Sequence, residues 1–299
     1  MTAKVWIEVA LNGPWGRERQ PGIPVREADI IADGIAAARA GAAIVHLHAY
    51  DEATGRQRDD WRIYARLIEG IRAKVDAIVY PTIPIAGSGF AGPATSRPGR
   101  YAHLDELGKR GLVEWGVVDP GSVNFASFAD IRAGKTGFTY LNPDEHVREG
   151  LAIAARHCLR PSYAIYEPGF ARLGAALAAI HRGLPTPIYR LMFSDAFAWG
   201  FPPTAYALDA YLALLRDCAP GAPVMVAGLG VDIRPLIGRA VERGTHVRVG
   251  LEDAPFGDDR TNAALVEEAS RLVRAAGGEP ATVKEARATA KASDMSPSR

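Results

Sequence analysis

The sequence contains little cysteine and no long apolar segment. Its 299 residues include two cysteines, Cys158 and Cys218, which form neither a CxxC pair nor a disulfide-dense pattern. Such a chain does not need an oxidising compartment, so we expect it to be cytoplasmic. No segment approaches the about 18 apolar residues of a membrane span, and the N-terminus lacks the apolar core and cleavage site of a secretory signal. We therefore expect neither export nor membrane insertion.

Neither sign of charge is in excess. Lys and Arg together number 35 and Asp and Glu 34, which gives a net charge of +1, and no long basic or acidic block occurs. Nucleic acid and membrane surfaces are therefore not expected partners. The sequence also lacks a glycine-rich phosphate loop, because GLGVD at 228–232 has no third glycine. These absences leave a small-molecule enzyme or a metabolite-binding protein as the predicted class.

Short β-branched segments alternate with longer amphipathic ones along most of the chain. Eight such βα units without a break in composition predict one (β/α)8 barrel, not an open doubly wound sheet. We expect the barrel domain over residues 1–278 and a C-terminal tail over 279–299 that begins as a helix and ends disordered. The predicted strands cover 5–11, 43–48, 77–82, 115–118, 162–165, 188–193, 224–227 and 247–250. The predicted helices cover 25–41, 59–74, 143–157, 170–182, 204–216, 233–243 and 261–276.

Two histidines end the second predicted strand, in the segment AIVHLHAYD. Residues two apart on a strand face the same side, so His46 and His48 should project together into the mouth of the barrel. Glu252 and Asp253 follow the eighth strand, which neighbours the first two strands in a closed barrel. Two imidazoles and one carboxylate with an open fourth position are the donors of a catalytic zinc site. We predict one divalent metal ion, with zinc favoured, on His46, His48 and Glu252.

Each half of this constellation also has a purely structural interpretation. The histidines can form a hydrogen-bonded pair in the barrel wall, and the two acidic residues can cap a following turn. Their common position at the carboxyl ends of neighbouring strands favours the metal site. A metal site alone leaves the reaction open. A hydrolase or a class II-type aldolase that works without CoA fits it, and so does a non-catalytic metabolite-binding barrel.

Four segments resemble a known family, the β-keto acid cleavage enzymes, which include the 3-keto-5-aminohexanoate cleavage enzyme of lysine fermentation. AGAAIVHLHAYD with the following TG, YPTIP, PGSVNF and GTHVRVGLED are similar to the motifs of this family, and they span nearly the whole chain. The resemblance implies a zinc-dependent (β/α)8 enzyme. It also implies that a β-keto acid and acetyl-CoA are converted to acetoacetate and a new acyl-CoA, and that the protein is a homo-oligomer, with a tetramer favoured.

The resemblance also assigns roles to residues of this chain. The metal ligands of the family fall on the three residues already chosen from strand geometry. Its acid–base aspartate falls on Asp253, and its arginine, which would steady anionic intermediates, falls on Arg248. A third-strand hydroxyl falls on Thr82, and a fourth-strand polar pair falls on Ser122 and Asn124. Each has a structural alternative, such as a core ion pair for Arg248 or a helix cap for Ser122.

The chain departs from the family near the predicted substrate site. Tyr50 stands where many members have an arginine, so it would offer a hydroxyl instead of a cation. Members that take an aminated substrate have glutamates at positions that fall near Trp15 and on Ala164, so an ammonium group would lack its partners here. We therefore predict an uncharged or apolar acyl tail, or a tail that Trp15, Arg17 or Arg19 contacts in the first loop.

Overall fold

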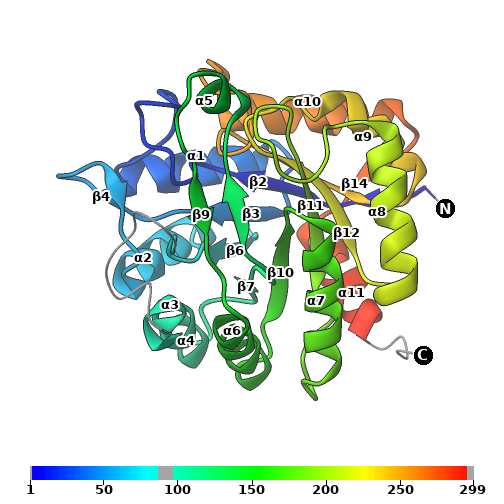
Figure 1. Ribbon diagram of the computed structural model, residues 1–299. Helices are drawn as coiled ribbons and strands as arrows, with labels where there is room; N and C mark the ends of the chain where they lie inside the picture. The colour runs from blue at the N-terminus through cyan, green and yellow to red at the C-terminus, as the bar shows by residue number, and fades with distance from the viewer. Residues whose placement is uncertain (1, 87–96, 295–299) are drawn as a thin grey trace.

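Eight parallel strands form the centre of the computed structural model, which describes residues 2–86 and 97–294. They are β2 (Ile7–Ala10), β3 (Ile44–Leu47), β6 (Ile78–Pro81), β7 (Trp115–Val117), β10 (Arg160–Ile165), β11 (Ile188–Phe193), β12 (Val224–Gly228) and β13 (His246–Val249). Around the sheet the order is β6–β3–β2–β13–β12–β11–β10–β7, and β7 lies beside β6, so the sheet closes on itself. The predicted (β/α)8 barrel is confirmed (Figure 1).

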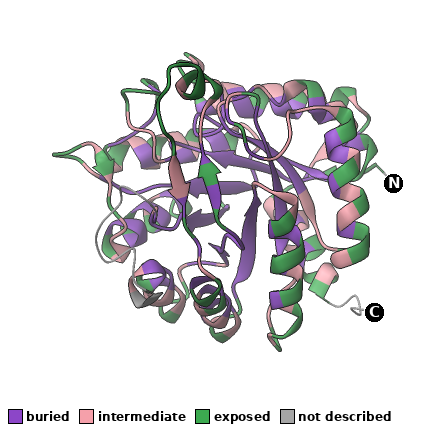
Figure 2. Cartoon of the chain, viewed as in Figure 1, coloured by how far each residue is buried: buried purple, intermediate pink, exposed green. Residues whose placement is uncertain are grey.

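Helices surround the sheet, and the strands inside them are almost wholly buried (Figure 2). In α2 (Trp61–Arg72), the apolar residues Leu67, Ile68 and Ile71 recur at helical spacing and are buried on the inner face. Asp60 begins this helix by accepting a hydrogen bond from the backbone N–H of Arg62. The other main helices are α1 (Glu27–Arg39), α4 (Ala102–Lys109), α6 (Asp144–Arg156), α7 (Pro168–Ala179), α8 (Ala205–Cys218), α9 (Arg234–Glu242) and α10 (Asn262–Ala275).

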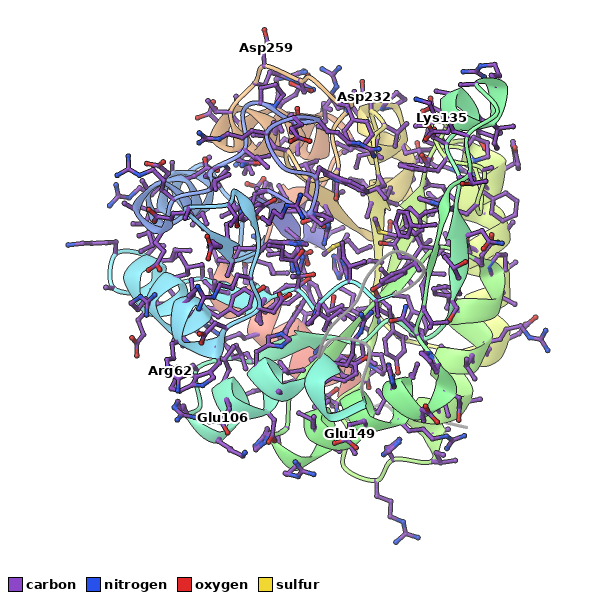
Figure 3. All side chains as sticks on the ribbon, turned by 60° about the vertical axis from the view of Figure 1, so that its left-hand side comes forward. Arg62, Glu106, Lys135, Glu149, Asp232 and Asp259 are labelled. Atoms are coloured by element: carbon purple, nitrogen blue, oxygen red, sulfur yellow. The ribbon has the colours of Figure 1, made fainter. Side chains whose placement is uncertain are left out.

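Charged side chains are found both outside and inside the barrel. Arg62, Lys135 and Asp259 lie at the periphery and are exposed (Figure 3). Within the barrel, by contrast, Glu8 and Arg248 are 0% and 1% exposed. Burying a charge is costly unless it is paired, so the interior charges mark the region where function is expected. No helix within residues 2–86 and 97–294 is long and apolar enough to cross a membrane.

The C-terminal region packs against the start of the barrel strands. Its elements are β14 (Glu279–Pro280), which pairs in parallel with β1 (Lys4–Val5), and α11 (Val283–Asp294). Arg160, the first residue of β10, binds Asp294 at 2.8 Å, and Arg287 binds Glu114 at 2.7 Å. These contacts attach α11 to the barrel. The disorder expected at the end of the tail concerns residues 295–299, which lie outside the described residues.

Every barrel strand begins and ends within two residues of a predicted one, but several short elements were not predicted. Strands of two or three residues are too short to show an alternating pattern, and short helices show little periodicity. The additional elements lie mostly between barrel strands and the helices that follow them. They are β4 (Tyr50–Asp51), β5 (Arg56–Gln57), β8 (Val123–Phe125), β9 (Phe138–Tyr140), α3 (Arg97–Arg100), α4 and α5 (Phe128–Arg132).

His246, at the start of β13, is buried as a neutral base. Its ring stacks on Trp6 with 3.9 Å between ring centroids and 8° between the planes. The backbone N–H of Trp6 donates to Nδ1 of His246 at 3.1 Å, so the ring carries its proton on Nε2. Burial lowers the pKa of His246 to about 3. Protonation of this ring is therefore coupled to unfolding.

We expect the free energy of unfolding to fall as the pH drops from 6.5 toward about 3, partly through His246. In this window the unfolded chain binds a proton at His246 and the folded chain does not, which lowers stability by up to about 1.4 kcal/mol per pH unit. His246→Asn, whose amide oxygen can still accept from Trp6, should show a pH dependence shallower by this amount. Urea unfolding between pH 4 and 7 measures both slopes, and equal slopes would contradict the account.

Candidate active site

Three possible metal ligands meet at the carboxyl ends of β3 and β13, the two strands that flank β2. His46 lies on β3, His48 follows two residues later, and Glu252 lies just beyond β13. The Nε2 atoms of His46 and His48 are 3.6 Å and 3.4 Å from Oε2 of Glu252. All three side chains are buried, and one ligand atom from each lies within 4.8 Å of the others. The structure thus brings together the three residues that the sequence singled out as ligands.

The donor atoms of this triad suit a divalent cation. With metal–ligand bonds of about 2.0 Å in tetrahedral geometry, two ligand atoms on one ion lie about 3.3 Å apart. The imidazole–carboxylate separations of the triad are close to this value. Nε2 of His48 and Oε2 of Glu252 are buried without a hydrogen-bond partner in the described part of the chain, which is unfavourable for polar atoms that bind nothing. The triad would leave one coordination position for water or substrate.

Gln57, on β5, orients one of the ligands. Its Nε2 donates to both carboxylate oxygens of Asp59 at 2.9 Å, so its Oε1 faces Nδ1 of His48, 2.9 Å away. Nδ1–H of His48 then donates to Gln57, and the lone pair of Nε2 points toward Glu252. Groups that hold a ligand imidazole in this way raise metal affinity. An element that was not predicted from the sequence therefore helps to shape the site.

Two glycines allow Glu252 to reach the triad. Gly250 has a φ of 140°, and a Cβ there would lie 2.1 Å from the carbonyl oxygen of Ala10. Gly13 has a φ of 63°, and a Cβ there would lie 2.6 Å from Cγ of Glu252. A side chain at either position would combine backbone strain with a steric clash. The backbone N–H of Glu252 donates to Ala10 at 3.2 Å and fixes the loop over β2.

Arg248, on β13, pairs with three carboxylates. Its Nε and Nη2 donate to the two oxygens of Asp253, each at 2.8 Å. Nη2 also lies 2.8 Å from Oε1 of Glu252, and Nη1 donates to Glu8 at 3.1 Å. The guanidinium is thus fixed directly below the triad.

The ion pairs of Arg248 affect two adjacent carboxyl groups, Glu252 and Asp253, whose pKa values are shifted in opposite directions. Burial raises the pKa of Asp253 to about 6, although Arg248 opposes this shift. Burial also acts to raise the pKa of Glu252, but Arg248 and the two imidazoles outweigh it and hold that pKa well below its usual range. Glu252 therefore stays anionic, as a metal ligand must be. Asp253 can exchange a proton near neutral pH.

A cavity that is partly open to solvent lies beside the triad. Its walls carry two buried arginines, Arg190 and Arg248, and the buried Asp119. The rest of the wall is largely apolar, and its aromatic side chains are Trp15, Phe125, Phe138, Tyr140 and Tyr166. A pocket with few polar groups in an apolar wall is typical of small-molecule sites.

Some residues predicted from the sequence line this cavity. Thr82 lies just beyond β6 and is buried in the wall. Trp15 comes from the first loop, and its Nε1 donates to the carbonyl oxygen of Glu252 at 3.1 Å. Ala164, on β10, also lines the cavity. These three residues are placed to contact a substrate held beside the triad.

Other residues predicted from the sequence do not line the cavity. Tyr50 is buried, and its hydroxyl donates to a backbone carbonyl of the first loop. Ser122 and Asn124 are exposed at the β8–β9 hairpin, where the chain turns away from the barrel after β7. Asp253 lies behind Arg248, which holds both of its oxygens. Asp253 is connected to the cavity through Arg248, which lines the wall.

Arg190 and Asp119 were not predicted from the sequence. Arg190 is the one charged residue of the run IYRLMF, and Asp119 lies two residues beyond the end of β7. A charge inside an otherwise apolar barrel strand is a signal in itself, because its side chain must point either into the barrel or toward the covering helices. Ligands were predicted only at the ends of strands, which left out Arg190 in the middle of β11. Asp119 lies at the end of a strand but was not chosen.

Loss of the Gln57 contact should weaken metal binding. Gln57→Leu removes the acceptor for Nδ1 of His48, and we expect the affinity for Zn²⁺ to fall about 10- to 100-fold. Gln57→Glu combined with Asp59→Asn keeps an acceptor for Nδ1 of His48 without bringing two carboxylates together, and it should retain tight binding. Competition with a chromophoric chelator measures both. Equal affinity of wild type and Gln57→Leu would show that Gln57 does not position His48.

Several known proteins are similar to this chain in sequence or in fold. A 3-oxoadipate:acetyl-CoA acetyltransferase of Cupriavidus necator is 28% identical over 96% of this chain and 95% of its own. A 3-dehydrocarnitine:acetyl-CoA trimethylamine transferase of Rhizobium meliloti is 27% identical over 93% of each chain. The solved structure of ObcA has the same fold, with a TM-score of 0.73 at 17% identity, and the match covers 91% of this chain and 66% of ObcA. The family model of the beta-keto acid cleavage enzymes matches residues 4–291, and the chain belongs to this family.

Proposed function

We propose that the protein condenses a β-keto acid with acetyl-CoA and releases acetoacetate and a new acyl-CoA. One observation carries the proposal. The chain belongs to the β-keto acid cleavage enzymes. Its buried triad of His46, His48 and Glu252 lies beside a largely apolar cavity that has Arg248 in its wall. A metal-binding triad and a cation beside an enclosed cavity are the groups needed to stabilise an enolate.

Acetyl-CoA is the proposed co-substrate. The names of two relatives include acetyl-CoA, and both relatives match nearly the whole chain. The chemistry requires an activated acyl acceptor, because cleavage of the β-keto acid must leave its acyl part on a carrier. A thioester provides both the electrophile for carbon–carbon bond formation and the thiolate that takes the acyl group.

The triad would hold the ion, which supplies Lewis acidity to a keto oxygen when bound. We assign the proton removed from C2 of the β-keto acid to Asp253, whose pKa suits an acid–base role. Arg248 lines the cavity and holds both oxygens of Asp253. A shift of its guanidinium toward the developing anion would stabilise that anion and free one carboxylate oxygen for the proton.

The bonds then exchange as follows. The C2 carbanion attacks the acetyl carbonyl of acetyl-CoA, a carbon–carbon bond forms, and CoA leaves as a thiolate. The thiolate adds to the original C3 carbonyl, and the bond between C2 and C3 breaks. The electron pair of that bond stays on C2, which takes back a proton as acetoacetate leaves. Thr82 and Trp15, in the cavity wall, would position the reacting groups.

We propose zinc as the ion, because two imidazoles and one carboxylate match its preferred donors. Cys158 and Cys218 are both free thiols, which fits the proposed cytoplasmic location. Ile131 and Ile180 are apolar and 51% and 63% exposed, and such side chains provide surface for the proposed homo-oligomer. A tetramer is the assembly that the family resemblance favours.

Removal of the acid–base carboxyl should abolish turnover without loss of the metal. We expect Asp253→Asn to lower kcat about 10²- to 10⁴-fold while it keeps one zinc per chain. The assay follows acetoacetate and new acyl-CoA by mass spectrometry, with a panel of β-keto acids and metal-loaded protein. Asp259→Asn, a matched change at an exposed aspartate, should leave kcat unchanged.

His46→Ala should lose both zinc and turnover in the same assay. Wild-type protein that holds zinc and produces acetoacetate from none of the β-keto acids would overturn the proposed function. An Asp253→Asn variant with full kcat would leave the reaction in place and remove Asp253 from the acid–base role.

A further inference from the structure

Arg190 is a buried cation in the cavity wall with few partners. It lies in the middle of β11, and its side chain is 3% exposed. Its hydrogen bond to the described residues runs from Nη2 to the carbonyl oxygen of Ser162 at 3.3 Å. Nε has no hydrogen-bond partner within residues 2–86 and 97–294. A guanidinium has five N–H donors, so most of the donors of Arg190 are available to a ligand.

Asp119 balances the charge of Arg190 without using its donors. Oδ1 of Asp119 is 3.9 Å from Nη2 of Arg190, beyond hydrogen-bonding distance. Both oxygens of Asp119 already have donors. Oδ1 accepts from the backbone N–H of Ala164 at 2.9 Å, and Oδ2 accepts from the hydroxyl of Tyr140 at 2.7 Å. Asp119 is therefore fixed in place, and Arg190 stays free for another acceptor.

Ala164 leaves space beside Arg190. The two residues are in register on the parallel strands β10 and β11, and both line the cavity. A methyl group at Ala164 fills little of the space between these strands. The neighbouring wall carries Val117, Leu229 and Tyr166. A cation beside open space in an apolar wall is suited to an anionic group of a ligand, since a charge–charge hydrogen bond is strong where water is excluded.

Arg190 and His46 face each other across the barrel. In the strand order, β11 is four places from β3, which carries His46, and an eight-stranded barrel has its opposite strand four places away. Glu252, just beyond β13, lies nearer, because β13 is two places from β11. The carboxylate and keto oxygens of a β-keto acid lie within three carbons of each other. If they occupy the triad, the acyl tail lies in the cavity whose wall carries Arg190.

We propose that Arg190 binds a carboxylate at the far end of the acyl tail, so that the substrate is a 3-oxo dicarboxylic acid. This inference rests on the proposed function, whose substrate class it specifies. The sequence led us to expect an uncharged or apolar tail. That expectation was based on the first loop and on Ala164 and did not include Arg190 on β11, so we now propose a carboxylate instead. A carboxylate offers two oxygens to the free N–H groups of Arg190, which no apolar tail can do.

Three six-carbon 3-oxo acids that differ at carbon 6 test the assignment. Carbon 6 is a methyl group in the first, a primary alcohol in the second and a carboxylate in the third. We expect wild-type enzyme to prefer the carboxylate by at least about tenfold in kcat/KM over each of the others. Arg190→Met should lower kcat/KM for the carboxylate at least about 30-fold and should change the value for the methyl compound less than about threefold.

Further variants separate binding from folding. Arg190→Lys keeps the charge but not the planar fork, so it should restore part of the preference. Ala164→Glu would place a carboxylate in the space beside Arg190 and should abolish the preference without removal of the arginine. Arg160→Met removes a buried guanidinium that binds Asp294 at the start of β10 and does not line the cavity, and it should leave the ratio of kcat/KM values unchanged.

Two results would overturn the assignment. One is a wild-type preference for the methyl or alcohol compound. The other is an equal loss for the methyl and carboxylate compounds in Arg190→Met. Calorimetric binding of the acids to metal-loaded protein, without acetyl-CoA, should show the same preference. If none of the acids yields acetoacetate, the proposed function fails, and the calorimetric comparison of wild type with Arg190→Met still decides whether Arg190 binds the tail.

Discussion

The ion pairs of Arg248 are the constraint on which the site depends. A guanidinium that is 1% exposed must be compensated inside the barrel, and Glu8, Glu252 and Asp253 compensate it. These contacts hold Glu252, the proposed metal ligand, next to Asp253, the proposed acid–base group, and the pKa values of the two carboxyl groups are shifted in opposite directions.

The closed sheet explains why such distant residues can act together. Glu8, His46 and Arg248 lie on β2, β3 and β13, which are neighbours in the barrel although their positions span most of the chain. Parallel strands end on the same side, so the loops that follow them share one rim. The glycines at 13 and 250 then let two of these loops approach closely enough for Glu252 to join the histidines.

The sequence predicted the parts of the molecule that follow from periodicity. Alternation of strands and helices was sufficient for the barrel. The spacing of His46 and His48, together with the position of Glu252 after the last strand, was sufficient to predict that the three side chains meet. Gln57 could not be found in this way, because the two-residue strand that carries it has no pattern. Ser122 and Asn124, by contrast, were predicted to bind substrate but do not line the cavity. They follow a barrel strand, but the chain turns outward there into the β8–β9 hairpin.

Charged residues within the apolar barrel strands were the main feature of the sequence that the site prediction did not use. Glu8 and Arg190 interrupt apolar strands, and their side chains are buried. In a parallel barrel, where both faces of each strand are covered, a charged residue needs a partner or a ligand. Arg190 is only weakly paired with Asp119, and it lines the cavity. It therefore indicates the charge of the substrate tail, which the residues at the ends of the strands do not.

The central claim is that the acyl part of a β-keto acid is exchanged for the acetyl group of acetyl-CoA. Turnover of metal-loaded protein with acetyl-CoA labelled with ¹³C in both acetyl carbons tests it most directly. The account predicts label at carbons 3 and 4 of acetoacetate and an unlabelled new acyl-CoA. Release of the acyl part as a free acid, with the labelled acetyl-CoA unchanged, would contradict it and indicate hydrolysis.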